Sequence, residues 1–262
     1  MKLGVSTWSL LGVEVSDAVR MIGDAGFDYV ELWGEIPHAY PDWTDKRKLK
    51  DALSSYNFTV TMHAPFTDLN LATPYEPVKS AIEKALVQFV NFSDELGATI
   101  ITFHPGSVHN DAMVPQSIGN SVSMLKSLVK AADGRLTICI ENQARGRSKY
   151  HLPLGSTTES LELLLSQVDG SKLNLDTGHA HASDLDPIYL CEKYSDRIAE
   201  LHLSDNMGAT DDHLIPGEGT ADLKAIMSRV SGTLALVCLE LDPHRYLPKT
   251  VIEASLAFKS SI

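Results

Sequence analysis

The sequence predicts an α/β protein, a (β/α)8 (TIM) barrel that forms a single domain over residues 1–262. Short apolar runs of strand length alternate with longer stretches of helical periodicity, eight of each, a pattern typical of parallel strands joined by helices. The length of 262 residues suits one barrel, and no linker or low-complexity tract divides the chain. A doubly wound open sheet is the competing architecture, but residues 6–9 after the first expected strand lack its glycine-rich phosphate loop.

The individual elements follow from the switch between the two periodicities. The expected strands are Lys2–Trp8, Tyr29–Leu32, Thr59–His63, Thr99–His104, Leu136–Glu141, Lys172–Asp176, Ile198–Leu203 and Leu234–Glu240. The expected helices are Val15–Ala25, Lys46–Ser55, Pro77–Leu96, Gln116–Ala132, Thr158–Gln167, Pro187–Tyr194, Leu223–Arg229 and Pro248–Ser260. Gly26 and Gly97 fit the position after a helix, where glycine is favoured.

The loops that leave the strands are much longer than those that enter them. They span residues 33–43, 64–75, 105–115, 142–157 and 204–220 and carry most of the histidines, prolines and tryptophans. In barrels the functional face is formed by the carboxyl ends of the strands. We therefore expect the site on that face.

Composition and charge restrict the class of protein. The chain is 44% hydrophobic and 21% charged, as in ordinary soluble proteins, and its net charge is −12. Such a charge argues against nucleic acid as the partner without excluding it, because metal ions can dominate a local site. No apolar run reaches the length of a membrane span, and no signal peptide is evident, so we expect a cytoplasmic protein. Cys139, Cys191 and Cys238 are widely spaced and are expected to be reduced thiols.

Six consecutive expected strands end on an imidazole or a carboxylate. These residues are His63, His104, Glu141, Asp176, His202 and Glu240, and His179 follows closely after Asp176. Any one of them has a structural explanation, such as an aspartate that caps the next turn. The strands of a barrel converge on one axis, so the six together predict one pocket.

This set of side chains predicts a metal site. Imidazoles and carboxylates without thiolates suit Zn²⁺, Mn²⁺, Co²⁺, Fe²⁺ or Mg²⁺. Several buried carboxylates would repel one another, and a divalent cation removes that repulsion. We expect Mn²⁺, Zn²⁺ or Co²⁺, with one to three ions per chain.

Three further features lie in the expected loops. Asp211 and His213, with His179, would hold an additional metal or orient substrate, or form a solvated acidic loop. Arg145 and Arg147 are candidates for binding a substrate phosphate or carboxylate, and a solvent-exposed position is the alternative. Trp8 and Trp33 would stack on a sugar ring or simply pack at the rim.

These motifs resemble the xylose isomerase-like barrels, a superfamily that includes sugar isomerases and epimerases, inosose dehydratase-type enzymes and endonuclease IV. The resemblance covers nearly the whole chain. It is carried by residues 62–65 (MHAP), 103–106 (FHPG), 141–142 (EN), 175–180 (LDTGHA), 202–205 (HLSD), 211–213 (DDH), 217–219 (GEG) and 239–240 (LE).

The epimerase branch implies one divalent metal held by Glu141, Asp176, His202 and Glu240. Glu141 and Glu240 would then be the catalytic acid and base, exchanging a proton through a metal-stabilised enediolate. His179 would contact a substrate oxygen. This chain departs from that pattern at residues 145–147, where the branch has a further glutamate, and at residues 207–208, where it has an arginine.

The endonuclease IV branch implies three zinc ions that act on a phosphodiester. The chain has a suitable residue at all nine ligand positions: His63, His104, Glu141, Asp176, His179, His202, Asp211, His213 and Glu240. The match at Asp211 and His213 requires one extra residue before Gly217. The acidic charge and the arginine-containing loop at 143–150 depart from this branch.

The function expected from the sequence is a divalent-metal-dependent isomerase or epimerase of a sugar or sugar phosphate. The alternatives are an endonuclease IV-like zinc phosphodiesterase (an apurinic/apyrimidinic endonuclease) and a non-catalytic barrel that binds a metal or sugar. The partner is a small molecule and not a membrane, and a homo-oligomer remains open.

Overall fold

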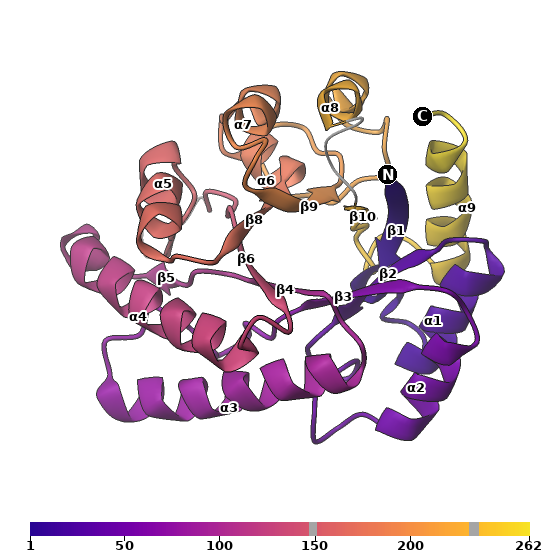
Figure 1. Cartoon of the computed structure of the whole chain (residues 1–262). Helices are drawn as coiled ribbons and strands as arrows, with labels where there is room; N and C mark the ends of the chain where they lie inside the picture. The colour runs from indigo at the N-terminus through magenta and orange to yellow at the C-terminus, as the bar shows by residue number, and fades with distance from the viewer. Residues whose placement is uncertain (147–150, 231–235) are drawn as a thin grey trace.

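Eight parallel strands close into a barrel in the computed structural model, which describes residues 1–146, 151–230 and 236–262. The strands are β1 (Lys2–Ser6), β2 (Tyr29–Trp33), β3 (Thr59–His63), β4 (Ile100–Phe103), β6 (Thr137–Glu141), β8 (Lys172–Asp176), β9 (Ile198–Leu203) and β10 (Leu236–Leu239). Their spatial order follows the sequence, and β10 pairs with β1 to close the ring (Figure 1). The (β/α)8 barrel is confirmed, and an open doubly wound sheet is excluded.

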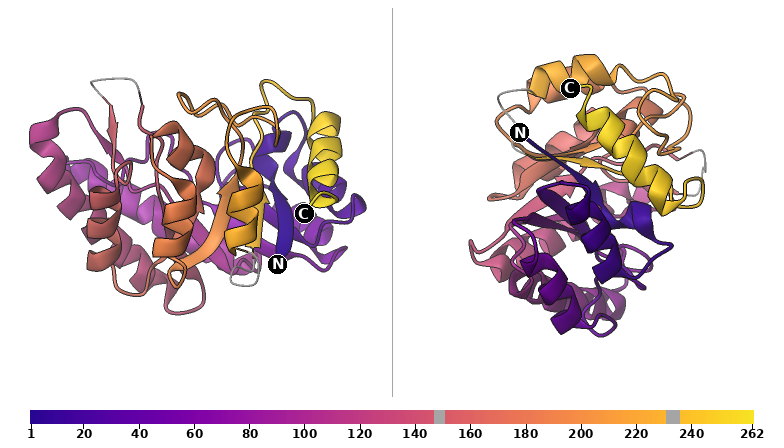
Figure 2. Two further views of the ribbon diagram at one scale, coloured as in Figure 1. Left: turned by 90° about the horizontal axis from the view of Figure 1, so that it is seen from above. Right: turned by 90° about the vertical axis from the view of Figure 1, so that its right-hand side faces the viewer.

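Helices surround the barrel and return the chain to the amino-terminal ends of the strands (Figures 1 and 2). They are α1 (Val15–Asp24), α2 (Lys46–Ser54), α3 (Glu76–Glu95), α4 (Val114–Ala132), α5 (Thr158–Gln167), α6 (Thr177–Ala182), α7 (Pro187–Lys193), α8 (Leu223–Val230) and α9 (Pro248–Lys259). Among the described residues, no helix is both long enough and apolar enough to cross a membrane.

The barrel strands and the helices around them match the predicted ones closely, with three main differences. The first strand ends at Ser6 because residues Thr7–Leu10 form a 3-10 turn, in which the Thr7 hydroxyl oxygen accepts a hydrogen bond from the Trp33 N–H at 2.8 Å. The short helix α6 was not predicted. The start of the expected last strand, residues 234–235, lies outside the described residues.

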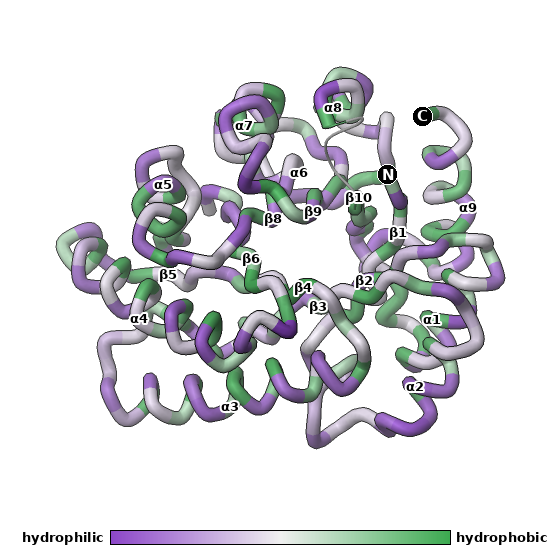
Figure 3. The backbone as a smooth tube through the Cα atoms, in the orientation of Figure 1, coloured by the Kyte–Doolittle hydropathy of each residue, from purple (hydrophilic) through white to green (hydrophobic). Residues whose placement is uncertain are grey.

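The apolar core lies mainly between the barrel and the helices. Along the outer helices the tube in Figure 3 alternates between hydrophobic and hydrophilic segments, as expected for helices with one buried face. The barrel interior also holds a polar layer, in which Glu200 accepts hydrogen bonds from Tyr29, Thr61 (2.9 Å) and Thr102 (3.3 Å). Burial raises the pKa of Glu200 to about 7. Polar side chains are thus buried on the barrel axis as well as at its mouth.

A two-stranded antiparallel sheet joins the loops that follow β4 and β6. It pairs β5 (Ser107–Val108) with β7 (Leu152–Pro153). Asn70, in the loop after β3, is bonded to both the N–H and the carbonyl of Ser107. Gly106 makes this close approach possible, because a Cβ there would lie 2.4 Å from the Asn70 side-chain oxygen. Three loops of the functional face are therefore tied together.

Candidate metal centre

The carboxyl ends of the strands open into a cleft of about 690 Å³. Nine of the predicted site residues line it: Trp8, Trp33, His63, His104, Glu141, His179, Asp211, His213 and Glu240. Asp176 and His202 are not among the lining residues because they lie buried beneath them, with 1% and 0% exposure. The structure thus brings eleven of the predicted site residues to one end of the barrel.

The deepest cluster is a tetrad of Glu141, Asp176, His202 and Glu240, contributed by β6, β8, β9 and the end of β10. His202 Nδ1 lies 2.9 Å from a Glu141 carboxylate oxygen and 3.1 Å from a Glu240 carboxylate oxygen. One potential ligand atom from each of the four residues lies within 4.8 Å of the others. The carboxylates of Glu141 and Glu240 therefore both contact the same nitrogen of His202.

The two carboxylate oxygens of Asp176 have different roles. Oδ1 accepts the backbone N–H of His179 at 2.8 Å and so caps helix α6. Oδ2 is buried and accepts no hydrogen bond within the described part of the chain, and the nearest cationic atom given for it is His179 Nδ1, at 3.5 Å. The aspartate is therefore a cap and also presents an unpartnered oxygen to the tetrad.

A second cluster comprises His63, His104 and Glu141. His104 Nε2 lies 2.8 Å from the second Glu141 oxygen, and His63 Nε2 lies 3.4 Å from the same atom. His63 Nδ1 donates to the Ala64 carbonyl at 2.9 Å, which leaves Nε2 directed at the carboxylate. Glu141 therefore belongs to both clusters, with one oxygen in each.

A third cluster comprises His179, Asp211 and His213. A single Asp211 oxygen lies 3.1 Å from His179 Nε2 and 3.0 Å from His213 Nε2. His179 Nδ1 donates to the Asn142 carbonyl at 2.8 Å, and His213 Nδ1 donates to the Glu240 carbonyl at 3.1 Å. Asp211 thus links His213 to His179, whose Nδ1 lies 3.5 Å from an Asp176 oxygen of the tetrad.

Asp205 organises the loop that carries the third cluster. Its buried carboxylate accepts the backbone N–H groups of Gly217 (2.9 Å), Gly219 (3.0 Å) and Ala221 (3.1 Å). A Cβ at Gly219 would lie 2.2 Å from an Asp205 oxygen, so glycine is required for this approach. The Asp205 and Leu214 backbones also form a bridge, which positions His213 beside β10.

The charges of the centre are strongly coupled. Burial alone would raise the pKa of Glu141, but His104, His202 and His63 hold it well below 4.5. Burial raises the pKa of Asp176 to about 6, with His179 opposing the change. Despite their burial, His63 and His213 have pKa values raised to about 9 by neighbouring carboxylates, and the pKa of His202 lies well above 6.5. The neighbouring carboxylates therefore favour the protonated forms of His63, His202 and His213.

The residues present fit a divalent cation. Asp176 Oδ2 is a buried acceptor without a hydrogen bond, and a cation among the tetrad would be its partner. A cation would also replace the protons that the imidazoles use to neutralise the carboxylates. Imidazole nitrogen and carboxylate oxygen are ligands of Zn²⁺, Mn²⁺ and Co²⁺. The other two clusters each offer three such ligands.

The remaining predicted residues have different positions. Trp8 packs edge-on against His213 with ring centroids 4.7 Å apart, and Trp33 packs edge-on against His38 at 6.0 Å. Arg145 is exposed and is not among the lining residues; its backbone N–H donates to the Ser183 hydroxyl at 2.7 Å. Arg147 lies outside the described residues.

Several contributors were not predicted as site residues. Asn142 joins β6 to β8 through paired 2.8 Å hydrogen bonds to the backbone of Asp176. Phe66 stacks on His104 with centroids 4.3 Å apart. Glu31 is fully buried, and its carboxylate contacts His202 Nε2 at 2.9 Å. The sequence signal for Glu31 was a single carboxylate in the middle of the otherwise apolar strand β2.

Fold and site together define a (β/α)8 barrel whose strand ends carry imidazoles and carboxylates grouped closely enough that they could hold a metal ion. The chain belongs to the xylose isomerase-like TIM barrel family, whose model matches residues 19–260.

Its relatives include sugar epimerases and proteins of the endonuclease 4 group. It is 28% identical to uncharacterized protein MJ1311 of Methanocaldococcus jannaschii, over 88% of this chain and 79% of that protein. It is 22% identical to fructoselysine 3-epimerase of Shigella flexneri, over 97% and 96% of the two chains. A protein described as "Probable endonuclease 4" of Aquifex aeolicus is 27% identical, over 66% of this chain and 64% of that one.

A crystal structure of a D-tagatose 3-epimerase-like protein superposes on this chain with a TM-score of 0.83. The two chains are 25% identical, and the match covers 100% of this chain and 99% of the other. The family and the sugar epimerases among the relatives agree with the resemblance inferred from the motifs.

Proposed function

We propose that the chain is a divalent-metal-dependent isomerase or epimerase of a sugar or sugar phosphate. The observation that carries this proposal is the placement of the Glu141 and Glu240 carboxylates, 2.9 and 3.1 Å from the same His202 nitrogen, beside the unpartnered oxygen of Asp176. Two carboxylates that flank one ligand position supply both a base and an acid. The epimerases among the relatives support the same assignment.

The chain's own residues would act as follows. One of the two glutamates removes the proton from the carbon next to the sugar carbonyl, and a protonated glutamate returns a proton, either to the same carbon from the opposite face or to its neighbour. A cation held by Glu141, Asp176, His202 and Glu240 would polarise the substrate's carbonyl and hydroxyl oxygens and lower the cost of removing that proton. His63 and His104 fix the orientation of Glu141 through its second oxygen.

Substrate would enter between aromatic side chains. Trp8, Trp33 and Phe66 line the cleft above the tetrad and offer apolar faces to the C–H face of a sugar ring. His179 lines the cleft beside the tetrad and would contact a hydroxyl oxygen of the substrate. Arg145 and Arg147 remain candidates for an anionic substituent of the substrate.

Deuterium exchange tests this function directly. Protein reloaded with Mn²⁺ or Co²⁺ would be incubated in D₂O with ketoses, aldoses and their phosphates, and NMR would detect exchange at the carbon next to the carbonyl. Glu141→Gln and Glu240→Gln should each reduce the rate by about 100-fold or more. Glu253→Gln, at an exposed carboxylate on α9 outside the cleft, is the matched control and should leave the rate unchanged. A panel in which no sugar exchanges would contradict the proposal.

A zinc phosphodiesterase of the endonuclease IV kind is the second candidate, favoured by one specific observation. All nine residues that the resemblance gives as ligands of three zinc ions fall into three adjacent groups, and Glu141 is shared by two of them. Metal analysis and incubation with an abasic-site duplex discriminate the two functions. One Mn²⁺ or Co²⁺ per chain supports the isomerase, whereas three Zn²⁺ with nicking of the duplex would replace it.

A further inference from the structure

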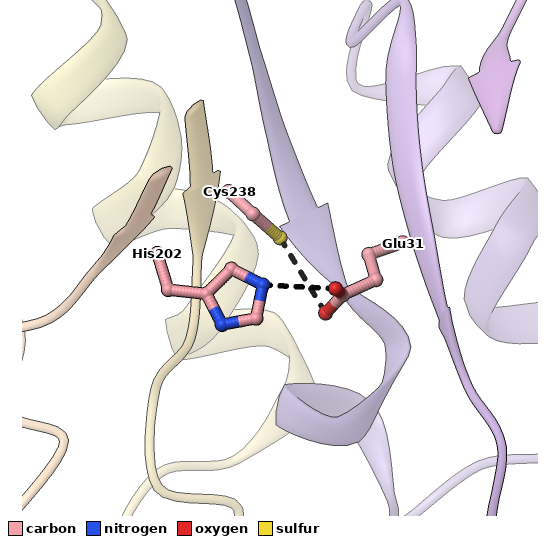
Figure 4. Close-up of side chains that lie close together, drawn as sticks. All are labelled: Glu31, His202 and Cys238. Carbon is pink, nitrogen blue, oxygen red and sulfur yellow. Dashed lines mark hydrogen bonds and ion pairs between the residues drawn. The ribbon is translucent and has the colours of Figure 1, made fainter. Parts of the chain in front are cut away.

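His202 uses its two ring nitrogens in opposite directions. Nδ1 faces the Glu141 and Glu240 carboxylates, at 2.9 and 3.1 Å. Nε2 faces away from them, toward Glu31 on β2, whose carboxylate oxygen lies 2.9 Å away (Figure 4). Both residues have 0% exposure. The ring is therefore fixed between the tetrad on one side and a single buried carboxylate on the other.

The second contact bears on how His202 can bind a cation. A neutral imidazole that gives its Nδ1 lone pair to a metal must carry its proton on Nε2, and a buried N–H needs an acceptor. Glu31 Oε2 is at hydrogen-bonding distance from Nε2 and supplies that acceptor. Metal-ligating histidines commonly have such a partner, which fixes both the tautomer and the orientation of the ring.

Asn174 on β8 reinforces this arrangement. Its side-chain amide lies 2.7 Å from His202 Nε2 and 2.9 Å from the Thr102 hydroxyl, while the amide oxygen has no hydrogen bond within the described residues. A 180° rotation of the amide places its oxygen next to Nε2, where it accepts the Nε2–H, and the Thr102 hydroxyl then donates its single proton to this oxygen at 2.9 Å instead of to Glu200 at 3.3 Å. The Nε2–H group then lies between two acceptors, Glu31 and Asn174.

Cys238 on β10 completes the surroundings of Glu31. Its sulfur lies 3.9 Å from the other Glu31 oxygen, and burial raises the pKa of the thiol well above 9, so the thiol donates to the carboxylate (Figure 4). Glu31, His202 and Cys238 also satisfy the distance criterion for a metal site of their own. The tetrad contains the unpartnered oxygen of Asp176, whereas each polar atom of Glu31, His202 and Cys238 has a hydrogen-bond partner. Hydrogen bonds therefore account for this group without a cation.

We propose that Glu31 is a positioning residue that holds His202 in the Nε2–H tautomer, with Nδ1 free to bind a cation at the tetrad. This rests on the proposed metal-dependent function, because it concerns the same tetrad. It assigns a role to a strand, β2, that contributes no ligand to that tetrad.

The test measures metal binding and not turnover. Metal-free wild-type protein and Glu31→Gln would be titrated with Co²⁺, following the visible absorption of the bound ion and the heat of binding. Loss of the charge behind His202 should weaken binding about 10- to 100-fold. In Zn²⁺-loaded protein labelled with ¹⁵N-histidine, the wild type should show His202 protonated at Nε2 and metal-bound at Nδ1.

Two matched variants separate positioning from a general effect on the barrel. Glu200→Gln changes another fully buried carboxylate on the barrel axis that contacts Tyr29, Thr61 and Thr102 and does not contact His202. Cys238→Ala removes the thiol beside Glu31 while leaving the carboxylate in place. Both should bind Co²⁺ within about twofold of wild type, and circular dichroism in chelator should show that all variants fold.

The possible outcomes are distinct. Equal Co²⁺ affinity in wild type and Glu31→Gln would overturn the role of Glu31 and leave the isomerase proposal standing. The same loss in Glu31→Gln and Glu200→Gln would also overturn it, because the effect would not be specific to His202. Weakened binding in Glu31→Gln without deuterium exchange of any sugar would support the positioning role and contradict the isomerase. A wild-type chain that binds no Co²⁺ would overturn both.

Discussion

Replacing Asp176 with asparagine should stabilise the metal-free protein above neutral pH. Burial raises the pKa of Asp176 from 3.8 to about 6, so the folded state binds this proton more tightly than the unfolded state does. The ionised carboxylate therefore costs stability as pH rises from about 4 to 6, and the full cost of about 3 kcal/mol applies above that window, at 1.36 kcal/mol per pKa unit. Asparagine removes the charge and keeps an oxygen that can cap helix α6 at the position of Oδ1.

Urea unfolding in chelator at pH 8 and pH 4 measures this effect. Asp176→Asn should exceed the wild type by about 3 kcal/mol at pH 8, and the difference should nearly vanish at pH 4. Adding Mn²⁺ or Zn²⁺ at 100 times its Kd should stabilise the wild type by about 2.7 kcal/mol and the variant much less. A variant that is less stable than the wild type at pH 8 in chelator would refute the reasoning, because Asp176 would then be stabilising without a cation.

Three further predictions concern the same centre. Glu240→Gln should have the circular dichroism spectrum and thermal midpoint of the wild type, but its turnover should be at least about 100-fold lower. Turnover at the wild-type rate would show that Glu240 is not part of an acid–base pair. Metal affinity should rise with pH up to about 9, because a cation at the tetrad neutralises Glu141 and Glu240, which help to raise the pKa values of His63 and His213 to about 9, and so promotes release of those protons. Calorimetry in buffers of different ionisation enthalpy should show proton release, and its absence at pH 7 would contradict this coupling. Asp205→Asn should lower the free energy of unfolding by about 3 kcal/mol, because an amide N–H replaces the oxygen that accepts two glycine N–H groups. Urea unfolding at pH 8 measures this loss, and an unchanged midpoint would exclude a structural role for the Asp205 carboxylate.

The barrel and much of its site could be predicted because strand position and side-chain chemistry are both local in sequence. An apolar run that ends in His63 or Glu141 fixes the element and the end at which the polar group lies. The closed topology then brings the groups together. His179 was also predicted as a site residue, although helix α6 was not, because it follows Asp176 at the end of a predicted strand.

The features of the site that could not be predicted depend on contacts between residues that are far apart in the sequence. Whether Asp176 is a cap or a ligand residue could not be decided from sequence, because its two oxygens take different partners. Glu31 was not predicted as a site residue, because nothing local shows that its carboxylate faces a histidine on β9, five barrel strands later in the chain. The predicted role of Arg145 and Arg147 in anion binding depends on side-chain direction, which is not encoded locally; Arg145 is exposed, and Arg147 lies outside the described residues.

The small sheet formed by β5 and β7 has a consequence for which ligands the cleft can accept. Ser107 and Pro153, which pair in that sheet, both line the cleft, and Asn70 attaches the loop after β3 to the same unit. Because these loops are hydrogen-bonded to one another, none of them can move independently, and this wall of the cleft should keep its shape. The opposite wall includes Asp242 and Arg245, from the loop after β10. Selectivity for substrate size should therefore be altered more readily by changes in the loop after β10 than by changes in the sheet.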